Sequence, residues 1–361
     1  MAKPASPLPR PARALLITFG AIIVLGVAAV AGVNGYVRVA FAPFYERAER
    51  AFPIPGAGVG FVCQDLDCLD DGQTWLFSGY QADGSPSPLY RRAADGSVTR
   101  VFLRLPDGSL YDGHGSAVTS AEGRVYVACE GGYLVTDEAS VADAPDDQAV
   151  PVLGRVELGF SPSFMNVEGE IMYAGAFYHP DDYETPASWR MTTPDGTENP
   201  SLMFAFPADP AAQWGFSAEP AAAYSIPGMI QGVCATPDGG IVLSQSFGLA
   251  TSHLLVYDAA SLEPDGTLSA TALADGRESD GAADGGAASG SAGAAGAPDP
   301  LADVPLYCLD GRSLVEDVAA PPMTEGIESH GGLVYVSEES ASDKYHFGKL
   351  YGAGQVYALA L

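Results

Sequence analysis

The chain has 361 residues, a formal net charge of −28 and five cysteines, and 47% of its residues are hydrophobic. This apolar content excludes global disorder, and the acidity speaks against a nucleic-acid partner, because binding to phosphates rests on Lys and Arg. The charge is unevenly divided. Residues 1–50 carry six basic and two acidic side chains, whereas residues 51–361 carry 11 basic and 43 acidic ones. Such asymmetry is typical of a membrane-associated segment in front of an acidic, soluble domain.

Residues 14–37 contain no charged side chain. They exceed the roughly 20 residues that a helix needs to cross a bilayer. Lys3, Arg10 and Arg13 precede this run, and such positive flanks favour a cytoplasmic N-terminus. We therefore expect four regions: a cytoplasmic tail (1–13), a transmembrane signal anchor (14–37), a juxtamembrane stalk with a helix (38–57) and an extracytoplasmic domain (58–361). The membrane is thus an expected partner.

A cleaved secretory peptide is the alternative interpretation of the same segment. Ala29-Val30-Ala31 is an A-x-A site, and cleavage near Ala31 would release the domain. The apolar run continues past this site through Val37, which favours the uncleaved anchor.

Beyond residue 58, short β-branched and aromatic runs alternate with Asp-Gly steps such as Asp107-Gly108. Asp-Gly supplies the positive φ angles of tight hairpins, so the pattern predicts antiparallel meanders. The chain also repeats itself. Residues 163–175 (SFMNVEGEIMYAG) align without gaps with residues 325–337 (EGIESHGGLVYVS), and looser copies lie at 64–78, 114–129 and 231–244. This alignment places Tyr126, Tyr173 and Tyr335 at equivalent positions of a second strand.

Each repeat continues into further strands. Third strands are expected at Pro88–Arg92, Gly132–Thr136, Trp189–Thr193, His253–Asp258 and Gln355–Leu359. Fourth strands are expected at Thr99–Leu103, Val152–Leu158 and Leu202–Phe206, and strand-like sequence resumes at Pro305–Leu309 and Ser313–Ala319. Residues 264–303 are mostly Ala, Gly, Ser and Asp, so we expect a disordered insertion within the fourth unit.

Four-stranded units repeated at about 40–50 residues predict an all-β protein, a β-propeller. Five blades are favoured. A sixth, formed from residues 206–228 or split around the insertion, stays open, and a segment near Gly58–Val62 is expected to close the ring. A β-sandwich would also alternate strands and turns, but it does not predict ungapped internal repeats.

Four segments carry a family resemblance: FVCQDLD (61–67), GYQADGSPSPLY (79–90), MIQGVCATPDGGIVLSQSFG (229–248) and SEESASDKYHFGK (337–349). They resemble those of uncharacterised, signal-anchored bacterial β-propeller proteins. More distantly, the chain is similar to the YVTN, NHL and SMP-30 (gluconolactonase-like) propeller superfamily. The resemblance implies the fold. SMP-30-like enzymes hold a divalent cation with Glu, Asn and Asp, but their ligand set has no residue-by-residue match here, so the activity is not carried over.

Propeller ligands usually bind where the innermost strands begin, at the mouth of the central channel. The repeat places polar residues at this position in every unit: Gln64, His114, Ser163, Gln231 and Glu325. Three residues further on it places Asp67, Asn166 and Glu328. Such a set suits a calcium ion or another divalent cation, or an acid and a base around a substrate. The alternative is that these groups hydrogen-bond neighbouring blades or ordered water.

The segment 337–349 holds the only two lysines of the domain, in a loop that follows the second strand of the last unit. Its charged residues form a second candidate site, a surface patch: Glu338, Glu339, Asp343, Lys344 and Lys349. The patch suits a ligand or partner, or its lysines only offset local acids.

These features favour a membrane-anchored binding or scaffold module that recognises an extracellular protein, a glycan or a small molecule. The alternative function is a metal-dependent hydrolase of the lactonase or phosphoesterase type that uses Asp67, His114, Asn166, Glu325 and Glu328. The sequence contains no Walker A, H-E-x-x-H or G-x-S-x-G motif.

Overall fold

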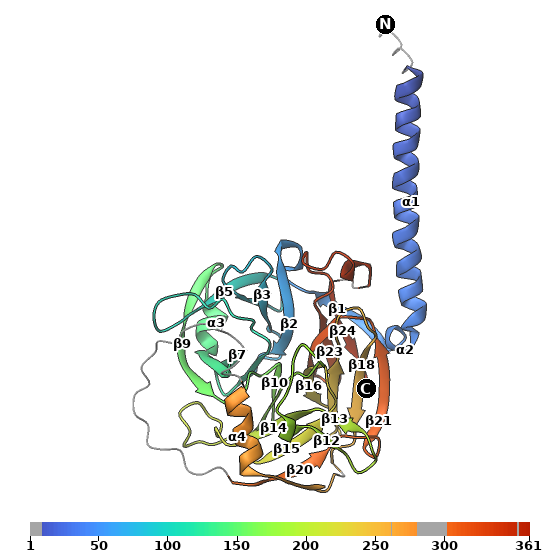
Figure 1. Cartoon of the computed structure of the whole chain (residues 1–361). Helices are drawn as coiled ribbons and strands as arrows, with labels where there is room; N and C mark the ends of the chain where they lie inside the picture. Colours follow the sequence, from blue (N-terminus) through green and yellow to red (C-terminus); the bar gives the residue numbers. More distant parts are fainter. Residues whose placement is uncertain (1–8, 261, 280–301, 352–353) are drawn as a thin grey trace.

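The computed structural model describes residues 9–260, 262–279, 302–351 and 354–361. Most of the expected tail over 1–13 and residues 280–301 of the expected insertion lie outside them. Figure 1 shows a ring of small sheets and a long helix that projects from one side of it. The expected all-β architecture is confirmed.

Five four-stranded blades make up the ring in the described part of the chain. Each blade is antiparallel, and its first strand lies innermost. The first blade comprises β2 (Phe61–Cys68), β3 (Trp75–Gln81), β4 (Pro88–Arg92) and β5 (Val98–Arg104), and the second comprises β6 (Val118–Ala121), β7 (Arg124–Cys129), β8 (Gly132–Asp137) and β9 (Gln148–Glu157). The third comprises β10 (Phe164–Glu168), β11 (Ile171–Gly175), β14 (Ser201–Pro207) and β15 (Ala222–Ile226). The fourth comprises β16 (Ile230–Ala235), β17 (Ile241–Gln245), β18 (Ser252–Tyr257) and β21 (Leu314–Ala320).

The fifth blade closes the ring. It comprises β22 (Thr324–His330), β23 (Leu333–Glu338), β24 (Gln355–Leu359) and, as its outermost strand, the N-terminal β1 (Ala48–Pro53). Closure by a segment near Gly58–Val62 is therefore wrong. The expected stalk instead forms the short helix α2 (Ala42–Tyr45), β1 and the 3-10 helix η1 (Ala57–Val59). Joining both ends of the chain in one sheet leaves no unpaired gap between first and last blades.

The innermost strands form a closed circle. Going round it, β2 contacts β6, β6 contacts β10, β10 contacts β16, β16 contacts β22, and β22 contacts β2 again. The repeat register is confirmed as well. Tyr126, Tyr173 and Tyr335 each occupy the third position of a second strand, opposite Thr119, Asn166 and Glu328. No sixth blade occurs among the described residues, because 206–228 supplies β15 to the third blade.

The third blade differs from the sequence expectation. Its third strand is β14, and Trp189–Thr193 lies in an excursion between β11 and β14. This excursion contains the 3-10 helix η2 (Ala187–Trp189) and a hairpin of β12 (Met191–Thr192) and β13 (Glu198–Asn199). Leu202–Phe206 is consequently a third strand and not a fourth one.

The segment 264–303 carries more structure than expected. It begins with β19 (Gly266–Leu268) and helix α4 (Ala270–Ser279), and β20 (Val304–Cys308) follows it. β20 pairs with β19 and, in parallel, with β15, which extends the third sheet. Trp189 donates its ring N–H to the carbonyl of Ala272 in α4.

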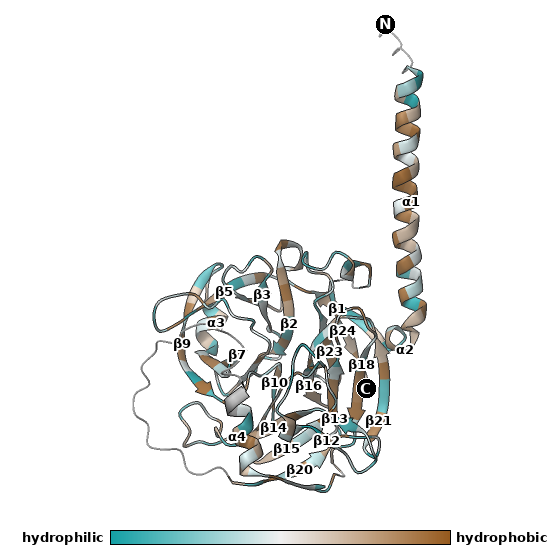
Figure 2. Cartoon of the chain, viewed as in Figure 1, coloured by the Kyte–Doolittle hydropathy of each residue, from teal (hydrophilic) through white to brown (hydrophobic). Residues whose placement is uncertain are grey.

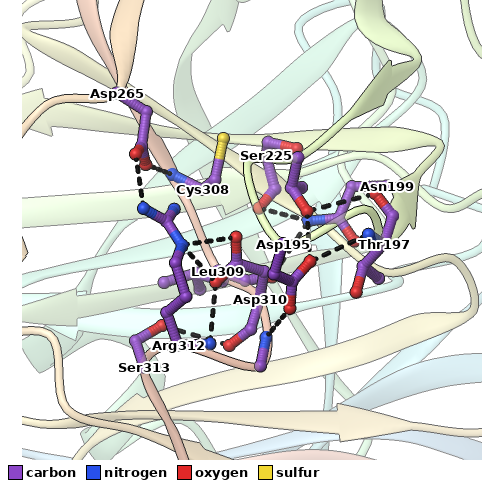
Figure 3. A network of polar contacts seen from close by, with 12 residues as sticks. Asp195, Thr197, Asn199, Ser225, Asp265, Cys308, Leu309, Asp310, Arg312 and Ser313 are labelled. Atoms are coloured by element: carbon purple, nitrogen blue, oxygen red, sulfur yellow. Dashed lines mark hydrogen bonds and ion pairs between the residues drawn. The ribbon is translucent and has the colours of Figure 1, made fainter.

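A polar network fixes the connection from β20 to β21 (Figure 3). Arg312 forms ion pairs with Asp265 and with the fully buried carboxylate of Asp310. Asn199 donates from its amide nitrogen to the carbonyls of Ser225 and Leu309 at 3.0 and 2.9 Å. The excursion of the third blade, the stem of the insertion and the fourth blade are thereby tied together.

Apolar side chains pack between the sheets, and α1 (Arg10–Ala40) is attached to this core only at its C-terminal end. Val37, Phe41 and Phe44 are buried with residues of the fourth and fifth blades, including Tyr357. The rest of the helix is apolar and exposed (Figure 2), and it is long and apolar enough to span a membrane. All five cysteines are unpaired, and Cys68 alone among them is not fully buried.

Candidate functional site at the propeller axis

Two separately predicted sites meet at one end of the propeller axis, where the innermost strands begin. The loop between β23 and β24 brings Lys344 and Glu339 to Gln64 and His114. We call this group the mouth cluster and define it by seven residues: Gln64, Tyr80, His114, Glu325, Glu339, Lys344 and Tyr345. Five of them were predicted from the sequence as site residues, although as members of two different sites.

Lys344 is exposed and lies against two tyrosine rings. Its ammonium nitrogen is 4.6 Å from the ring centroid of Tyr80 and 5.2 Å from that of Tyr345, and it donates to the Tyr80 hydroxyl. The Tyr80 ring also packs on the imidazole of His114, with centroids 4.4 Å apart. A cation on aromatic faces is attractive, and it holds Lys344 over the end of the axis.

A chain of hydrogen bonds runs inward from His114. Nε2 of His114 lies 2.5 Å from Oε1 of Gln64, and Nε2 of Gln64 donates to Glu339 at 3.1 Å. Because an amide oxygen only accepts, the imidazole carries its proton on Nε2 and leaves Nδ1 as an acceptor. The surrounding protein, and then the charge of Lys344, lower the pKa of His114 to about 4, although His114 is exposed. The ring is therefore neutral at pH 7.

Replacing Lys344 with Met should raise the pKa of His114, since the variant lacks the nearby positive charge. The pKa should stay below the ordinary value of about 6.5, because the desolvation remains. An NMR titration of the histidine ring protons, with the signal assigned through His114→Gln, measures the shift. Lys349→Met removes a lysine from the same loop and should leave this pKa unchanged. An equal effect of both variants would contradict the arrangement.

Below the mouth, Glu325 and Glu339 form a carboxyl pair. Glu325 is 2% exposed. Burial, followed by the charge of Glu339, raises its pKa well above the ordinary value, and burial also raises the pKa of Glu339. The raised pKa favours the protonated form of Glu325, which can donate to Glu339, and the hydroxyl of Tyr345 also bonds to Glu339.

Further along the axis, a second group of acids surrounds Asn166. Its amide nitrogen donates to Glu328 at 2.7 Å and to the carbonyl of Val233 at 3.0 Å. Burial raises the pKa of Asp67 to about 7 and that of Glu328 well above its ordinary value. Burial also raises the pKa of Glu168. We call Asp67, Asn166, Glu168 and Glu328 the axial cluster.

Several of these groups also join neighbouring blades, as the alternative interpretation holds. Asp65 accepts from the backbone N–H of Val118 at 2.9 Å, and Glu168 accepts from that of Ala235 at 2.8 Å. Ser163 donates to the carbonyl of Ile230 at 3.3 Å, so it bridges blades and does not join the mouth cluster. Some of the predicted residues therefore bridge neighbouring blades, and others lie at the mouth of the axis.

The remaining predicted residues lie apart from both clusters. Gln231 is half-buried in β16, and the described residues show no hydrogen bond between its side chain and the mouth cluster. Glu338 turns away and accepts from Ser340 and from the N–H of Gly354. Asp343 and Lys349 pair with each other on the surface of the loop.

Sequence reasoning did not select Tyr80, Tyr345, Asp65 or Glu168 as site residues. Tyr345 lies within the lysine segment and Asp65 lies beside Gln64, so the predicted site residues next to them could have pointed to both. Glu168 follows Asn166 by two positions on a strand, which places both side chains on one face. Tyr80 joins the cluster through tertiary contacts with His114 and with the loop of the last blade, which no local pattern reveals.

The described residues contain no group of three or more His, Cys, Asp or Glu side chains arranged to hold a metal ion. The carboxyls along the axis are spread over successive strand positions. The expected calcium or other divalent cation therefore stays a prediction.

Comparisons with known proteins address the fold. No family model and no curated protein matches the chain. Among solved structures it is similar to a PQQ-bound aldose sugar dehydrogenase from Streptomyces coelicolor, at 12% identity over 87% of this chain and 97% of that one (TM-score 0.41). It is also similar to regucalcin, a calcium-binding protein from Agrobacterium tumefaciens (11% identity, 86% and 94%, TM-score 0.35), and to the Dos1 propeller (10% identity, 81% and 68%, TM-score 0.31). The propeller assignment itself rests on the strand order of this chain.

Proposed function

We propose that the chain is a membrane-anchored, extracytoplasmic binding module that recognises a hydroxyl-rich ligand, such as the end of a glycan, at the mouth cluster. One observation carries this proposal: Lys344 lies over Tyr80 and Tyr345, beside a neutral His114. Charge, aromatic surface and hydrogen-bonding groups converge there from three separate segments of the chain.

The chemistry of the cluster suits such a ligand. Tyrosine rings offer an apolar face to carbon-bound hydrogens, and their hydroxyls offer hydrogen bonds at the edge. The ammonium group of Lys344 donates, Nδ1 of His114 accepts, and the carboxylate of Glu339 accepts. A small number of polar groups around aromatic surface is the usual composition of a small-molecule site.

The anchor is supported by the length and exposure of α1. The helix runs without a break from Arg10 to Ala40, and therefore through the A-x-A site at Ala29-Val30-Ala31. Its apolar side chains from Leu15 to Val30 are exposed, which in water would be an unfavourable surface. Insertion into a bilayer removes that surface from water.

A glycan array probed with the full chain in detergent tests the binding function. We expect one group of related glycans to be retained, and we expect Lys344→Met to abolish this binding. Lys349→Met is the matched control, because it removes a lysine of the same loop that pairs only with Asp343 in the described contacts. Failure to bind any glycan, or equal loss in both variants, would contradict the proposed site.

The alternative function, a metal-dependent hydrolase, is not favoured. Its expected residues are divided between the mouth cluster, with His114 and Glu325, and the axial cluster, with Asp67, Asn166 and Glu328. This division leaves no single centre where an acid, a base and a metal ion would meet.

A further inference from the structure

We infer that the mouth end of the propeller lies directly on the lipid surface, with Phe347 and Val59 in contact with the bilayer. This inference rests on the proposed function of α1 as a membrane anchor. It adds an interaction surface that the anchor alone does not require, since anchored domains are often separated from the membrane by a linker.

The first step is the length of the helix. A crossing needs about 20 residues, and a span that begins at Ala14, after the charged Arg13, ends near Val33. Val33 is also the first helix residue that packs against the propeller core. The helix therefore has no free turn between the membrane and the domain.

The second step is the position of α1 relative to the axis. The helix contacts the 3-10 helix η4 (Gly348–Leu350), which belongs to the same β23–β24 loop as Lys344. Figure 1 shows this loop, in red, at the end of the propeller past which α1 extends. The membrane must consequently lie on the mouth side.

The third step is the surface found on that side. Phe347, beside η4, is 71% exposed, and Val59 in η1 is 67% exposed. The two segments adjoin, because the N–H of Asp343 bonds to the carbonyl of Ala57 at 3.3 Å. Leu249, in the β17–β18 connection at the same end, is 51% exposed. An exposed aromatic ring near the end of a membrane helix is typical of the headgroup region.

The fourth step is charge. Residues 51–361 carry 43 acidic side chains, and because like charges repel, anionic lipids in the facing leaflet would oppose the approach of the domain. The two lysines of the domain, Lys344 and Lys349, are both exposed on the mouth-side loop that adjoins α1. Lys349 pairs with Asp343, whereas Lys344 places its positive charge where the acidic domain meets the membrane. A ligand held at the mouth cluster would then lie at the level of the lipid headgroups.

Three tryptophan variants of the full chain, reconstituted in nanodiscs, test this inference. Phe347→Trp probes the proposed contact and Leu25→Trp probes the anchor. Val315→Trp is the matched control, because Val315 is 68% exposed and lies near the start of β21, at the opposite end of the propeller. The signal is the emission that each variant adds to the parent, with and without doxyl quenchers on the lipid chains, one placed near the headgroup for Phe347→Trp and one near the end of the chain for Leu25→Trp.

We expect quenching to reduce the added emission of Phe347→Trp and Leu25→Trp by about half or more and to leave that of Val315→Trp unchanged. If Leu25→Trp is quenched and Phe347→Trp behaves as Val315→Trp does, the lipid contact is wrong and the anchor stands. If Leu25→Trp is not quenched, the anchor itself is wrong, and the lipid contact fails with it.

Discussion

We expect Gly326→Ala to destabilise the propeller more than any other glycine-to-alanine substitution along its axis. The new Cβ would lie 1.7 Å from Oδ1 of Asp65 and 2.6 Å from its Cα. Neither group can move aside, because Asp65 accepts from the N–H groups of Leu66 and Val118 and β22 is held between β2 and β16. Overpacking usually costs about 1–3 kcal/mol, and contact with backbone atoms should bring the loss to about 4 kcal/mol or more.

Thermal unfolding of the full chain in detergent measures this effect. Gly266→Ala is the control, because its added Cβ meets no atom within 4 Å. We expect the control to melt near the parent and Gly326→Ala to melt far below it or to fail to fold. Equal melting temperatures would show that β22 and β2 do not approach each other as closely as described.

Stability should fall as the pH rises from about 4 to 8, because the folded protein holds carboxyl protons that the unfolded chain releases. Burial raises the pKa of Asp67 to about 7, and the pKa of Glu328 is raised by burial and then by the charge of Asp67. A raised carboxyl pKa contributes its full stability below the unfolded value, and the contribution is lost as the pH rises through the folded value. For Asp67 alone, a rise of about three units corresponds to up to about 4 kcal/mol.

Asp67→Asn should therefore raise the melting temperature at pH 8 and flatten its dependence on pH. The amide oxygen can still accept the hydrogen bond that Asp67 receives from Ser120. Asp112→Asn makes the same chemical change at an exposed position outside the axial cluster and is the matched control. A profile that is as steep in Asp67→Asn as in the parent would contradict the proton held at the axial cluster.

Retaining several buried carboxyls along one axis is costly, because each of them loses its hydration on burial. Residues that reduce stability in this way are often kept for function. The mouth cluster fits that pattern, because burial raises the pKa of both Glu325 and Glu339 close to the exposed Lys344.

The sequence predicted the inner half of each blade well and the outer half less well. Tyr126, Tyr173 and Tyr335 were aligned correctly because the first two strands of a blade share a short Gly turn, so their pairing is local. Closure by β1 was not predicted, since its pairing with β24 joins residues about 300 positions apart and its flanking sequence is compatible with a helix.

Local pattern also failed in the third blade. Met191–Thr192 has strand-forming residues, but they pair with Glu198–Asn199 in a separate hairpin, and the blade continues only at Ser201. Tertiary contacts also bring together the two predicted sites, the channel-mouth residues and the surface patch of the lysine segment. Gln64 and Glu339 are 275 residues apart in the chain, and the closed ring brings them within hydrogen-bonding distance.

Mass spectrometry of the N-terminus of the mature, membrane-fractionated protein tests the anchored propeller most directly. An anchored chain keeps α1, so its N-terminus should precede Ala14 and the protein should remain with the membranes after a carbonate wash. A mature N-terminus at Gly32, with the propeller in the soluble fraction, would contradict the anchor and show that the domain is released.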